Sequence, residues 1–383
     1  MIFIILNETF FIHRFLFSER LNLGIFFYLK TIYSVKLKLL FHIIPTLRGG
    51  GAETVLSRIV EELSKSGIVQ CVFTLKGSIN DMHYPKVSKY AKVINHKKDF
   101  KLINEIILEN PEAPILSWMY PGILFSHRLK YRLKTKNPIV WNIRHSNFRW
   151  YQIYQKLALF GFGFYSRLIN PKIIYCAHSS KLVHEKYFFS KKNSIVIQNR
   201  LAKKMMPFKK NLKDSKQPFL LYVGRYDPVK GPDRLIKIAQ EFLKNKESYS
   251  LTIAGSGWKD AMIPQDLKSK VLLAGNVSNI SELYQEAVVL LFTSYTEGYP
   301  NVLVEALASG TPIIGYEAGD SRLILDSYDL GYSVSNQKQF IDRLNLLTKE
   351  LPSQNQKLKA AQRQIKQLDF SITVSEYKKF LTL

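Results

Sequence analysis

The sequence predicts an α/β protein made of two doubly wound, parallel-sheet domains that face each other across a cleft. At 383 residues the chain is longer than one hydrophobic core usually supports. Short apolar runs alternate with helical patterns, stop once, and then alternate again. Strands separated by helices form parallel sheets covered on both faces, so the single break predicts two sheets. The composition, 46% hydrophobic and 22% charged, is that of a globular protein.

The first series of predicted elements starts near residue 38. Helical patterns occupy Ala52–Lys65 and His178–Phe189. The apolar runs between the helical patterns have the length of buried strands. Strands are expected at Leu39–Pro45, Val69–Leu75, Ala113–Trp118, Pro138–Ile143, Ile173–Cys176 and Ser194–Gln198.

The alternation stops over residues 201–217, a lysine-rich segment with little apolar pattern, which we interpret as a linker. It then restarts at Phe219. Strands are expected at Phe219–Val223, Ser250–Ala254, Val271–Ala274, Val288–Thr293 and Pro312–Gly315. Helices are expected at Pro232–Lys244, Asn279–Glu286, Pro300–Ser309 and, at the end, Phe370–Leu383.

These patterns divide the chain into five parts. We predict an extension over 1–37, a first domain over 38–200, a linker over 201–217, a second domain over 218–368 and a C-terminal helix over 369–383, free to return to the first domain. Ligands in doubly wound sheets bind outside the carboxyl ends of the strands. The loops that follow the strands are therefore the candidate site.

The net charge of +25 is unevenly distributed. Residues 1–217 contain 36 Lys and Arg against 12 Asp and Glu, whereas residues 218–383 contain 19 against 18. Such asymmetry indicates that the first half meets an anionic partner: nucleic acid, a phospholipid surface or an acidic substrate. The alternative explanation is a general enrichment of lysine in the sequence. Such an enrichment would raise the charge of both halves, so the uneven distribution argues against it.

The first 37 residues allow two interpretations. Met1–Phe17 is rich in Ile, Phe and Leu but is interrupted by Glu8, His13 and Arg14, so a membrane-spanning helix is disfavoured. The basic start and cleavage site of a signal peptide are also missing. The segment is either an interfacial amphipathic anchor or an extension outside the working fold.

The two cysteines, Cys71 and Cys176, both lie in apolar runs that we predict to be strands. Buried free thiols in a reducing cytoplasm are the expected state, with a disulfide as the alternative.

Two loops of the second domain carry residues suited to a diphosphate. In Gly224–Gly231, Arg225 and Lys230 are two cations able to neutralise a diphosphate leaving group without a metal. In the next loop, Gly255 and Gly257 either allow a ligand to approach the backbone or make a tight turn. Each loop alone is weakly specific.

A third loop runs from Glu297 into the predicted helix Pro300–Ser309. The free amides at this helix start form an anion site. Glu305 lies on an otherwise apolar stretch, where a carboxylate costs free energy unless something pairs with it. One carboxylate then faces a sugar while the other reaches a ribose. The alternative for Glu297 is a helix-terminal charge that favours the dipole.

This segment closely resembles the signature of retaining nucleotide-sugar glycosyltransferases of the GT-B fold, glycosyltransferase family 4, whose two domains are Rossmann-like. The similarity runs from about Leu39 to the C-terminus, with the motifs in the family's order. It implies an acceptor-binding first domain and a donor-binding second domain. Glu297 would contact the donor sugar, Glu305 the ribose, and Arg225 with Lys230 the diphosphate. The implied donor site further contains Gly255, Val277, Glu282, Gly298, Tyr299, Pro300, Asn301, Val302 and Leu303.

The first domain contributes a glycine loop, Gly49, Gly50 and Gly51, before a predicted helix. Its spacing is not that of a dinucleotide fingerprint, and the resemblance places such a loop at the donor phosphates and the acceptor. His145 resembles the cleft histidine of many family members, and imidazole suits the orientation of a hydroxyl near neutral pH. Two positions depart from the family pattern: Pro121, where some relatives have His, and Arg200, where relatives usually have Gly.

Basic and aromatic residues are concentrated between Leu124 and Arg167. Such a mixture suits peripheral attachment to an anionic membrane leaflet, although aromatic residues also pack cores.

We therefore interpret the chain as a retaining, metal-independent glycosyltransferase. The donor would be a nucleotide sugar such as a UDP- or GDP-sugar, and we expect no other cofactor and no metal site. The sequence has no Asp-x-Asp triplet, which agrees with a metal-independent reaction. The acceptor would be a glycan, anionic and lipid-linked, in surface polysaccharide assembly (lipopolysaccharide or capsule). The expected place is the cytoplasm, peripherally at the inner face of the plasma membrane. The alternatives are a GT-B nucleotide-sugar epimerase, a phosphorylase and a basic nucleic-acid-binding protein. The sequence contains no known nucleic-acid-binding motif, so we expect no nucleic-acid partner.

Overall fold

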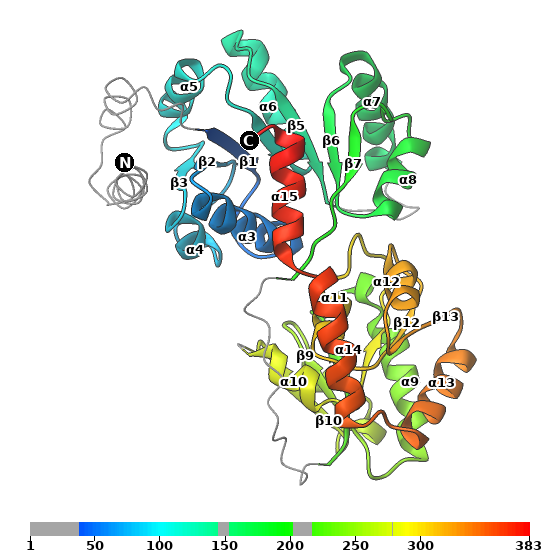
Figure 1. Cartoon of the computed structure of the whole chain (residues 1–383). Coiled ribbons are helices and arrows are strands. Elements are labelled where there is room, and N and C mark those ends of the chain that lie inside the picture. Colours follow the sequence, from blue (N-terminus) through cyan, green and yellow to red (C-terminus); the bar gives the residue numbers. More distant parts are fainter. Residues whose placement is uncertain (1–37, 145–152, 202–216, 278) are drawn as a thin grey trace.

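Two parallel sheets, one in each half of the chain, form the framework of the computed structural model (Figure 1), which describes residues 38–144, 153–201, 217–277 and 279–383. Every strand pairing in both sheets is parallel. The predicted fold class is therefore confirmed. Residues 1–37, His145 and most of the predicted linker lie outside the described residues.

The first sheet has seven strands in the order β3-β2-β1-β4-β5-β6-β7. Its strands are β1 (Leu39–Ile44), β2 (Val69–Thr74), β3 (Lys92–Asn95), β4 (Ile115–Trp118), β5 (Ile139–Ile143), β6 (Lys172–Tyr175) and β7 (Ser194–Val196). The helices between them are α3 (Gly51–Lys65), α4 (Tyr84–Ser88), α5 (Phe100–Glu109), α6 (Met119–Leu133), α7 (Ile153–Ile169) and α8 (His178–Lys186). Two buried clusters, one on each side of the sheet, form the core of this domain.

The second sheet has six strands in the order β10-β9-β8-β11-β12-β13. Its strands are β8 (Phe219–Val223), β9 (Ser250–Ala254), β10 (Val271–Gly275), β11 (Val289–Phe292), β12 (Ile313–Tyr316) and β13 (Gly331–Val334). The helices are α9 (Pro232–Lys244), α10 (Ile280–Glu286), α11 (Asn301–Ala308), α12 (Ser321–Ser327), α13 (Gln337–Lys349) and α14 (Gln354–Gln367), with short 3-10 turns η2 (Pro228–Lys230), η3 (Asp260–Met262) and η4 (Gln265–Leu267).

The C-terminal helix α15 (Phe370–Leu381) packs on the first domain beside α3, although it follows the second domain in the chain (Figure 1). Its apolar residues Phe370, Val374 and Tyr377 belong to the same buried cluster as β1 and α3. Backbone hydrogen bonds between Leu201 and residues 368–370 fix the place where the chain returns. The two domains are thus joined by two chain segments.

The strand order reverses between β1 and β4 in the first sheet and between β8 and β11 in the second. At such a switch point the loops at the carboxyl ends diverge to opposite faces of the sheet and leave a crevice for a ligand. The loops after β1, β4, β8 and β11 are therefore the loops that the topology places at a binding crevice.

Candidate functional site

Loops from both domains line one cavity of about 450 Å³. From the first domain come Gly51, Ala52, Glu53, Met119, Arg144, Cys176 and Asn199. From the second come Arg225, Val229, Lys230, Thr296, Glu297, Gly298, Tyr299, Pro300, Asn301 and Val302. A volume of this size suits a small-molecule ligand, and its position between two domains is a common one for such sites.

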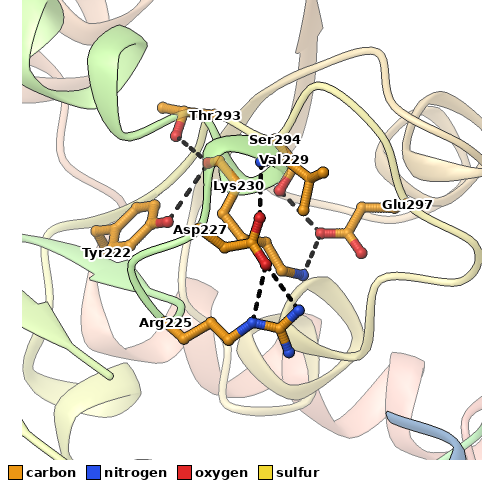
Figure 2. Close-up of polar contacts among 8 residues, drawn as sticks. All are labelled: Tyr222, Arg225, Asp227, Val229, Lys230, Thr293, Ser294 and Glu297. Carbon is orange, nitrogen blue, oxygen red and sulfur yellow. Dashed lines mark hydrogen bonds and ion pairs between the residues drawn. The ribbon is translucent and has the colours of Figure 1, made fainter. Parts of the chain in front are cut away.

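Lys230 and Glu297 form the closest charged pair in the cavity. Lys230 Nζ lies 2.5 Å from Glu297 Oε1, and the hydroxyl of Ser294 donates to the same oxygen at 2.8 Å (Figure 2). The two side chains are 25% and 13% exposed, so solvent screens the pair only in part. An ammonium group held beside a carboxylate at a cavity wall is available to an incoming anion.

The backbone at Lys230 is fixed from three sides. The hydroxyls of Thr293 and Tyr222 donate to the Lys230 carbonyl at 3.0 and 3.4 Å (Figure 2). The carboxylate of Asp227 accepts from the Val229 amide at 3.0 Å and so caps η2. The loop after β8 therefore presents Lys230 from a rigid turn.

Arg225 is held by Asp227, whose Oδ2 accepts from Arg225 Nε at 3.1 Å and Nη2 at 2.8 Å (Figure 2). Partial burial opposes ionisation of Asp227, but the Val229 amide and the Arg225 guanidinium outweigh it and keep its pKa below the ordinary value. The Arg225 side chain is 57% exposed and lines the cavity. It is oriented and still accessible, as a diphosphate-binding arginine has to be.

Gly255 does not line the cavity and has a structural role in the loop after β9. Its φ is +149°, and a Cβ atom there would lie 2.2 Å from the carbonyl oxygen of Gly224. The amide of Tyr226 also donates to Ser256 at 2.8 Å. The two glycine loops therefore pack directly on each other, and Gly255 supports the backbone that carries Arg225.

The start of α11 supplies most of the second-domain wall. Gly298, Tyr299, Pro300, Asn301 and Val302 line the cavity. The predicted site residue Leu303 does not: it is fully buried in the core, and its amide donates to the Pro300 carbonyl at 3.1 Å.

Glu305 lies one turn further along α11 and is absent from the cavity wall. Its carboxylate accepts from the hydroxyl of Tyr284 at 3.2 Å and lies 3.8 Å from the guanidinium of Arg58, on α3 of the first domain. Burial raises the pKa of Glu305, while Arg58 and the Tyr284 hydroxyl act in the opposite direction.

Val277 and Glu282, the residues expected beside the base, follow β10. Val277 is half-buried in the loop and Glu282 is exposed on α10. Neither lines the cavity. Since α10 contacts α11, these residues lie on the same side of the second domain as Glu305.

The glycine loop of the first domain leads into α3, and its last residue, Gly51, lines the cavity. A Cβ atom at Gly50 would lie 2.7 Å from Glu53 Oε2, so a larger residue there would displace the Glu53 carboxylate. Glu53 is 9% exposed and accepts a long hydrogen bond from Thr46 at 3.4 Å. None of the ion pairs among the described residues involves Glu53.

Sequence reasoning did not single out Glu53 or Arg58 as site residues. Glu53 had a detectable signal, an acid within the first turn of a helix that follows a glycine loop. Arg58 had none, because its partner Glu305 lies in the other domain.

Arg144 and Asn199 join the cavity to the hinge between the domains. Arg144 donates to Asn199 Oδ1 and, at 3.4 Å, to the hydroxyl of Tyr377 on α15. Asn199 Nδ2 in turn donates to Asn301 Oδ1, at the start of α11, at 3.2 Å. This chain of contacts connects the first sheet, the crossover and the second domain.

The two departures from the family pattern have different surroundings. Arg200 forms an ion pair with Glu376 on α15 at 2.8 Å, so its charge is paired with the returning helix. Pro121 is exposed in the first turn of α6. Next to it, Met119 lines the cavity with φ +59°, a left-handed conformation that non-glycine residues rarely adopt outside functional sites.

Both cysteines are free and buried. Burial raises the pKa of Cys71 to about 12 and also raises the pKa of Cys176, although Cys176 lines the cavity. Among the described residues, no group of three His, Cys, Asp or Glu side chains is placed to hold a metal ion. Over the same residues, no helix is long and apolar enough to cross a bilayer.

Comparison with known proteins shows which proteins the chain resembles. Residues 206–365 match the family model of the glycosyl transferases group 1. The match covers most of the second domain and indicates a glycosyltransferase, and the two parallel sheets have the architecture of GT-B glycosyltransferases of known structure.

Two relatives show how much of the chain the sequence similarity covers. A Campylobacter jejuni enzyme, GalNAc-alpha-(1->4)-GalNAc-alpha-(1->3)-diNAcBac-PP-undecaprenol alpha-1,4-N-acetyl-D-galactosaminyltransferase, is 25% identical over 360 residues, covering 88% of this chain and 97% of its own. The D-inositol 3-phosphate glycosyltransferase of Rhodococcus opacus is 28% identical over 141 residues, 33% of this chain and 31% of its own.

Solved structures share the fold. Anabaena HepE in complex with UDP superposes with a TM-score of 0.75 at 14% identity, covering 90% of this chain and all of that one. The lipopolysaccharide outer core galactosyltransferase WaaB superposes with a TM-score of 0.66 at 18% identity, covering 90% and 99%.

Proposed function

We propose that the chain is a retaining, metal-independent glycosyltransferase of family 4 that transfers a sugar from a nucleoside-diphosphate sugar to a lipid-linked glycan. The observation that carries the proposal is the cavity between the domains, where Lys230, Arg225 and Glu297 from the second domain face Glu53 and Gly51 from the first. Further support comes from HepE, solved with UDP and with UDP-glucose, and from the Campylobacter relative, whose acceptor is named as an undecaprenol diphosphate glycan.

Arg225 and Lys230 would hold the donor diphosphate. Two cations on one rigid loop neutralise the charge that develops on the leaving group, and preorganised electrostatic stabilisation of this kind lowers the barrier more than any other single effect in many enzymes. Lys230 is already paired with Glu297, so an incoming diphosphate shares the ammonium with that carboxylate.

The bond between the anomeric carbon and the diphosphate oxygen would then break, forming an oxocarbenium-like sugar beside Glu297. The acceptor hydroxyl attacks the face from which the diphosphate left, and its proton passes to the released diphosphate. No residue is assigned as a covalent nucleophile. Glu297 stabilises the positive charge on the sugar ring and orients its hydroxyls.

The acceptor would enter from the first domain. Glu53, nine-tenths buried on the opposite side from Lys230, is able to accept hydrogen bonds from sugar hydroxyls, and such pairing offsets the cost of a buried carboxylate. A lipid-linked acceptor places the reaction at a membrane, on the cytoplasmic side where nucleotide sugars are made, as part of surface polysaccharide assembly.

The test combines a donor screen with product analysis. The purified full chain is screened with UDP- and GDP-sugars for thermal stabilisation, and the stabilising donor is incubated with and without lipid-linked oligosaccharide. We expect transfer that needs the acceptor, a product with the anomeric configuration of the donor by NMR, full activity in EDTA, and near-complete loss of transfer in Glu297→Gln with unchanged folding. An inverted product would contradict retention, and donor isomerisation without acceptor would indicate the epimerase.

A further inference from the structure

Helix α7 carries large apolar side chains on the side that faces solvent. Leu157, Phe160, Phe164 and Leu168 are 62%, 43%, 64% and 67% exposed. Their spacing of three and four residues puts them on one side of the helix. The opposite side is the packed one, because Leu159 and Ser166 lie there and are 2% and 0% exposed. Four exposed large apolar residues in a row are unusual on a soluble monomer unless the surface binds something.

Phe188, which follows α8, extends this row. It is 51% exposed, and its ring centroid lies 5.9 Å from that of Phe160. The guanidinium of Arg167, on α7, lies over the Phe188 ring at 5.3 Å and donates to the Phe188 carbonyl at 2.8 Å. We call Leu157, Phe160, Phe164, Leu168 and Phe188 the α7 face.

The stretch of sequence that contains α7 carries charge of one sign. The sequence contains no Asp or Glu between residues 113 and 184, but eleven Lys and Arg. The first acid after this stretch, Glu185, lies 3.9 Å from both Lys181 and Lys191, so two lysines neutralise it. The elements that carry the α7 face, α7, α8 and the residues just beyond them, also carry the cations Lys156, Arg167, Lys181, Lys186, Lys191 and Lys192.

An exposed apolar row bordered by cations matches an anionic lipid leaflet, in which aliphatic and aromatic side chains enter the acyl boundary while Lys and Arg stay at the headgroups. A second copy of the chain is a poor occupant, because docking two α7 faces would bring like charges together. Nucleic acid would pair with the cations but would leave the apolar row in water.

The segments that lead into α7 and α8 start at the sheet edge that lines the cavity. The chain leaves β5 through Arg144, a cavity residue, before it forms α7. It leaves β6 through Cys176, also a cavity residue, and enters α8, whose first amides, His178 and Ser179, donate at 2.7 Å to Asp320 of the second domain. A leaflet on α7 and α8 would thus hold a lipid-linked acceptor near the cavity mouth.

We propose that the α7 face docks the enzyme on an anionic lipid leaflet. This proposal rests on the proposed function in one respect, because a membrane-bound acceptor is the reason for the enzyme to bind a membrane. Membrane binding itself can be measured without catalysis.

The test compares vesicle binding of the full chain and its variants. Vesicles of phosphatidylcholine, alone or with about 30% phosphatidylglycerol, are used in flotation assays with the wild type and with Phe164→Ser/Leu168→Ser. The matched control is Leu323→Ser/Leu346→Ser, which removes two exposed leucines of the second domain. We expect wild type and control to bind the anionic vesicles, and the α7 variant to bind at least about tenfold more weakly, because it loses two membrane-inserted side chains. Phe188→Ser is a second variant if the first does not fold.

Three outcomes would overturn the proposal. Equal binding of wild type and α7 variant would place the contact elsewhere, including residues 1–37. A concentration-dependent dimer that the α7 variant abolishes would make the α7 face a protein interface. Preferential binding to RNA, undiminished in the α7 variant, would show that the cations serve nucleic acid. Transfer to a short water-soluble acceptor fragment tests the proposed function separately, and we expect it to be unchanged in the α7 variant.

Discussion

Arg58 on α3 and Glu305 on α11 form an ion pair between the two domains, with 3.8 Å between Arg58 Nη2 and Glu305 Oε1. Each side chain is 15% exposed, and Glu305 also accepts from the Tyr284 hydroxyl. If Glu305 binds the donor ribose, the ribose has to share the carboxylate with Arg58 or displace it. Donor binding would then be coupled to the contact between the domains.

Glu305→Gln tests the ribose contact. A hydrogen bond to a charged group contributes about 1.5–3 kcal/mol, so we expect the donor KM to rise roughly 10- to 100-fold with a smaller change in kcat. Steady-state kinetics with varied donor checks this, and Glu350→Gln, an exposed glutamate just after α13, is the control. A donor KM equal to that of the wild type would remove Glu305 from the donor site.

Glu53→Gln tests the acceptor side. Because Glu53 lines the cavity from the first domain, we expect the acceptor KM to rise about tenfold or more while donor affinity stays within about twofold of the wild type. Thermal unfolding of the variant should match the wild type within a few degrees. A parallel rise in donor and acceptor KM would instead indicate a role in shaping the whole cavity.

Gly255→Ala tests the support of the diphosphate loop. The positive φ and the 2.2 Å approach to Gly224 leave no room for a methyl group, so the loop that carries Arg225 has to move. We expect a loss of stability of roughly 1–3 kcal/mol and weaker nucleotide binding. Gly161→Ala on α7 is the control, because a Cβ atom there meets nothing within 4 Å and alanine favours a helix. Equal stability of the two variants would contradict a steric role for Gly255.

How far the sequence predicts this architecture depends on the element. The long apolar runs at β1, β2, β8 and β9 were located to within a residue or so, because buried parallel strands have a strong hydrophobic signal. The edge strands β3 and β13 were missed, since four residues such as Lys92–Asn95 give no such signal and pair on one side only. The helices that were not singled out either are α4, α5, α6, α7, α12, α13 and α14.

Within the site, the motifs of the second domain were predictable because each lies in one continuous loop. Contacts between domains were not: Arg58 with Glu305, Asn199 with Asn301, and Asp320 with the start of α8 join residues more than 100 positions apart. Only the folded chain brings them together. The role predicted for His145 stays a prediction, because this residue lies outside the described residues.

We expect His42 to make the first domain sensitive to mild acid. It is fully buried, with Trp118 Nε1 donating to its Nδ1 at 3.2 Å and Gln70 Oε1 at 3.0 Å from its Nε2, and burial lowers its pKa from 6.5 to about 4. Below pH 6.5 the unfolded chain binds a proton that the folded chain excludes, so stability present above pH 6.5 is lost as the pH falls.

We expect the free energy of unfolding to fall by roughly 3 kcal/mol between pH 6.5 and 4 from His42 alone. Denaturant titrations at several values between about pH 7.5 and 4.5 measure it, and His42→Gln should flatten the slope even where the variant is less stable throughout. His127, whose pKa burial also lowers to about 4, adds to the slope in both proteins. The same pH dependence in His42→Gln and the wild type would contradict this assignment.

Calorimetry of nucleotide-sugar binding tests most sharply whether the cavity holds a sugar diphosphate. It compares the wild type with Arg225→Gln/Lys230→Gln and with Lys237→Gln, which removes an exposed lysine of α9 outside the cavity. If the cavity grips a sugar diphosphate, the wild type and Lys237→Gln will bind one UDP- or GDP-sugar alike, and the double variant at least about 100-fold more weakly, since it loses two charge-assisted contacts. Equal binding by the double variant, or no binding of any nucleotide sugar to the wild type, would contradict it.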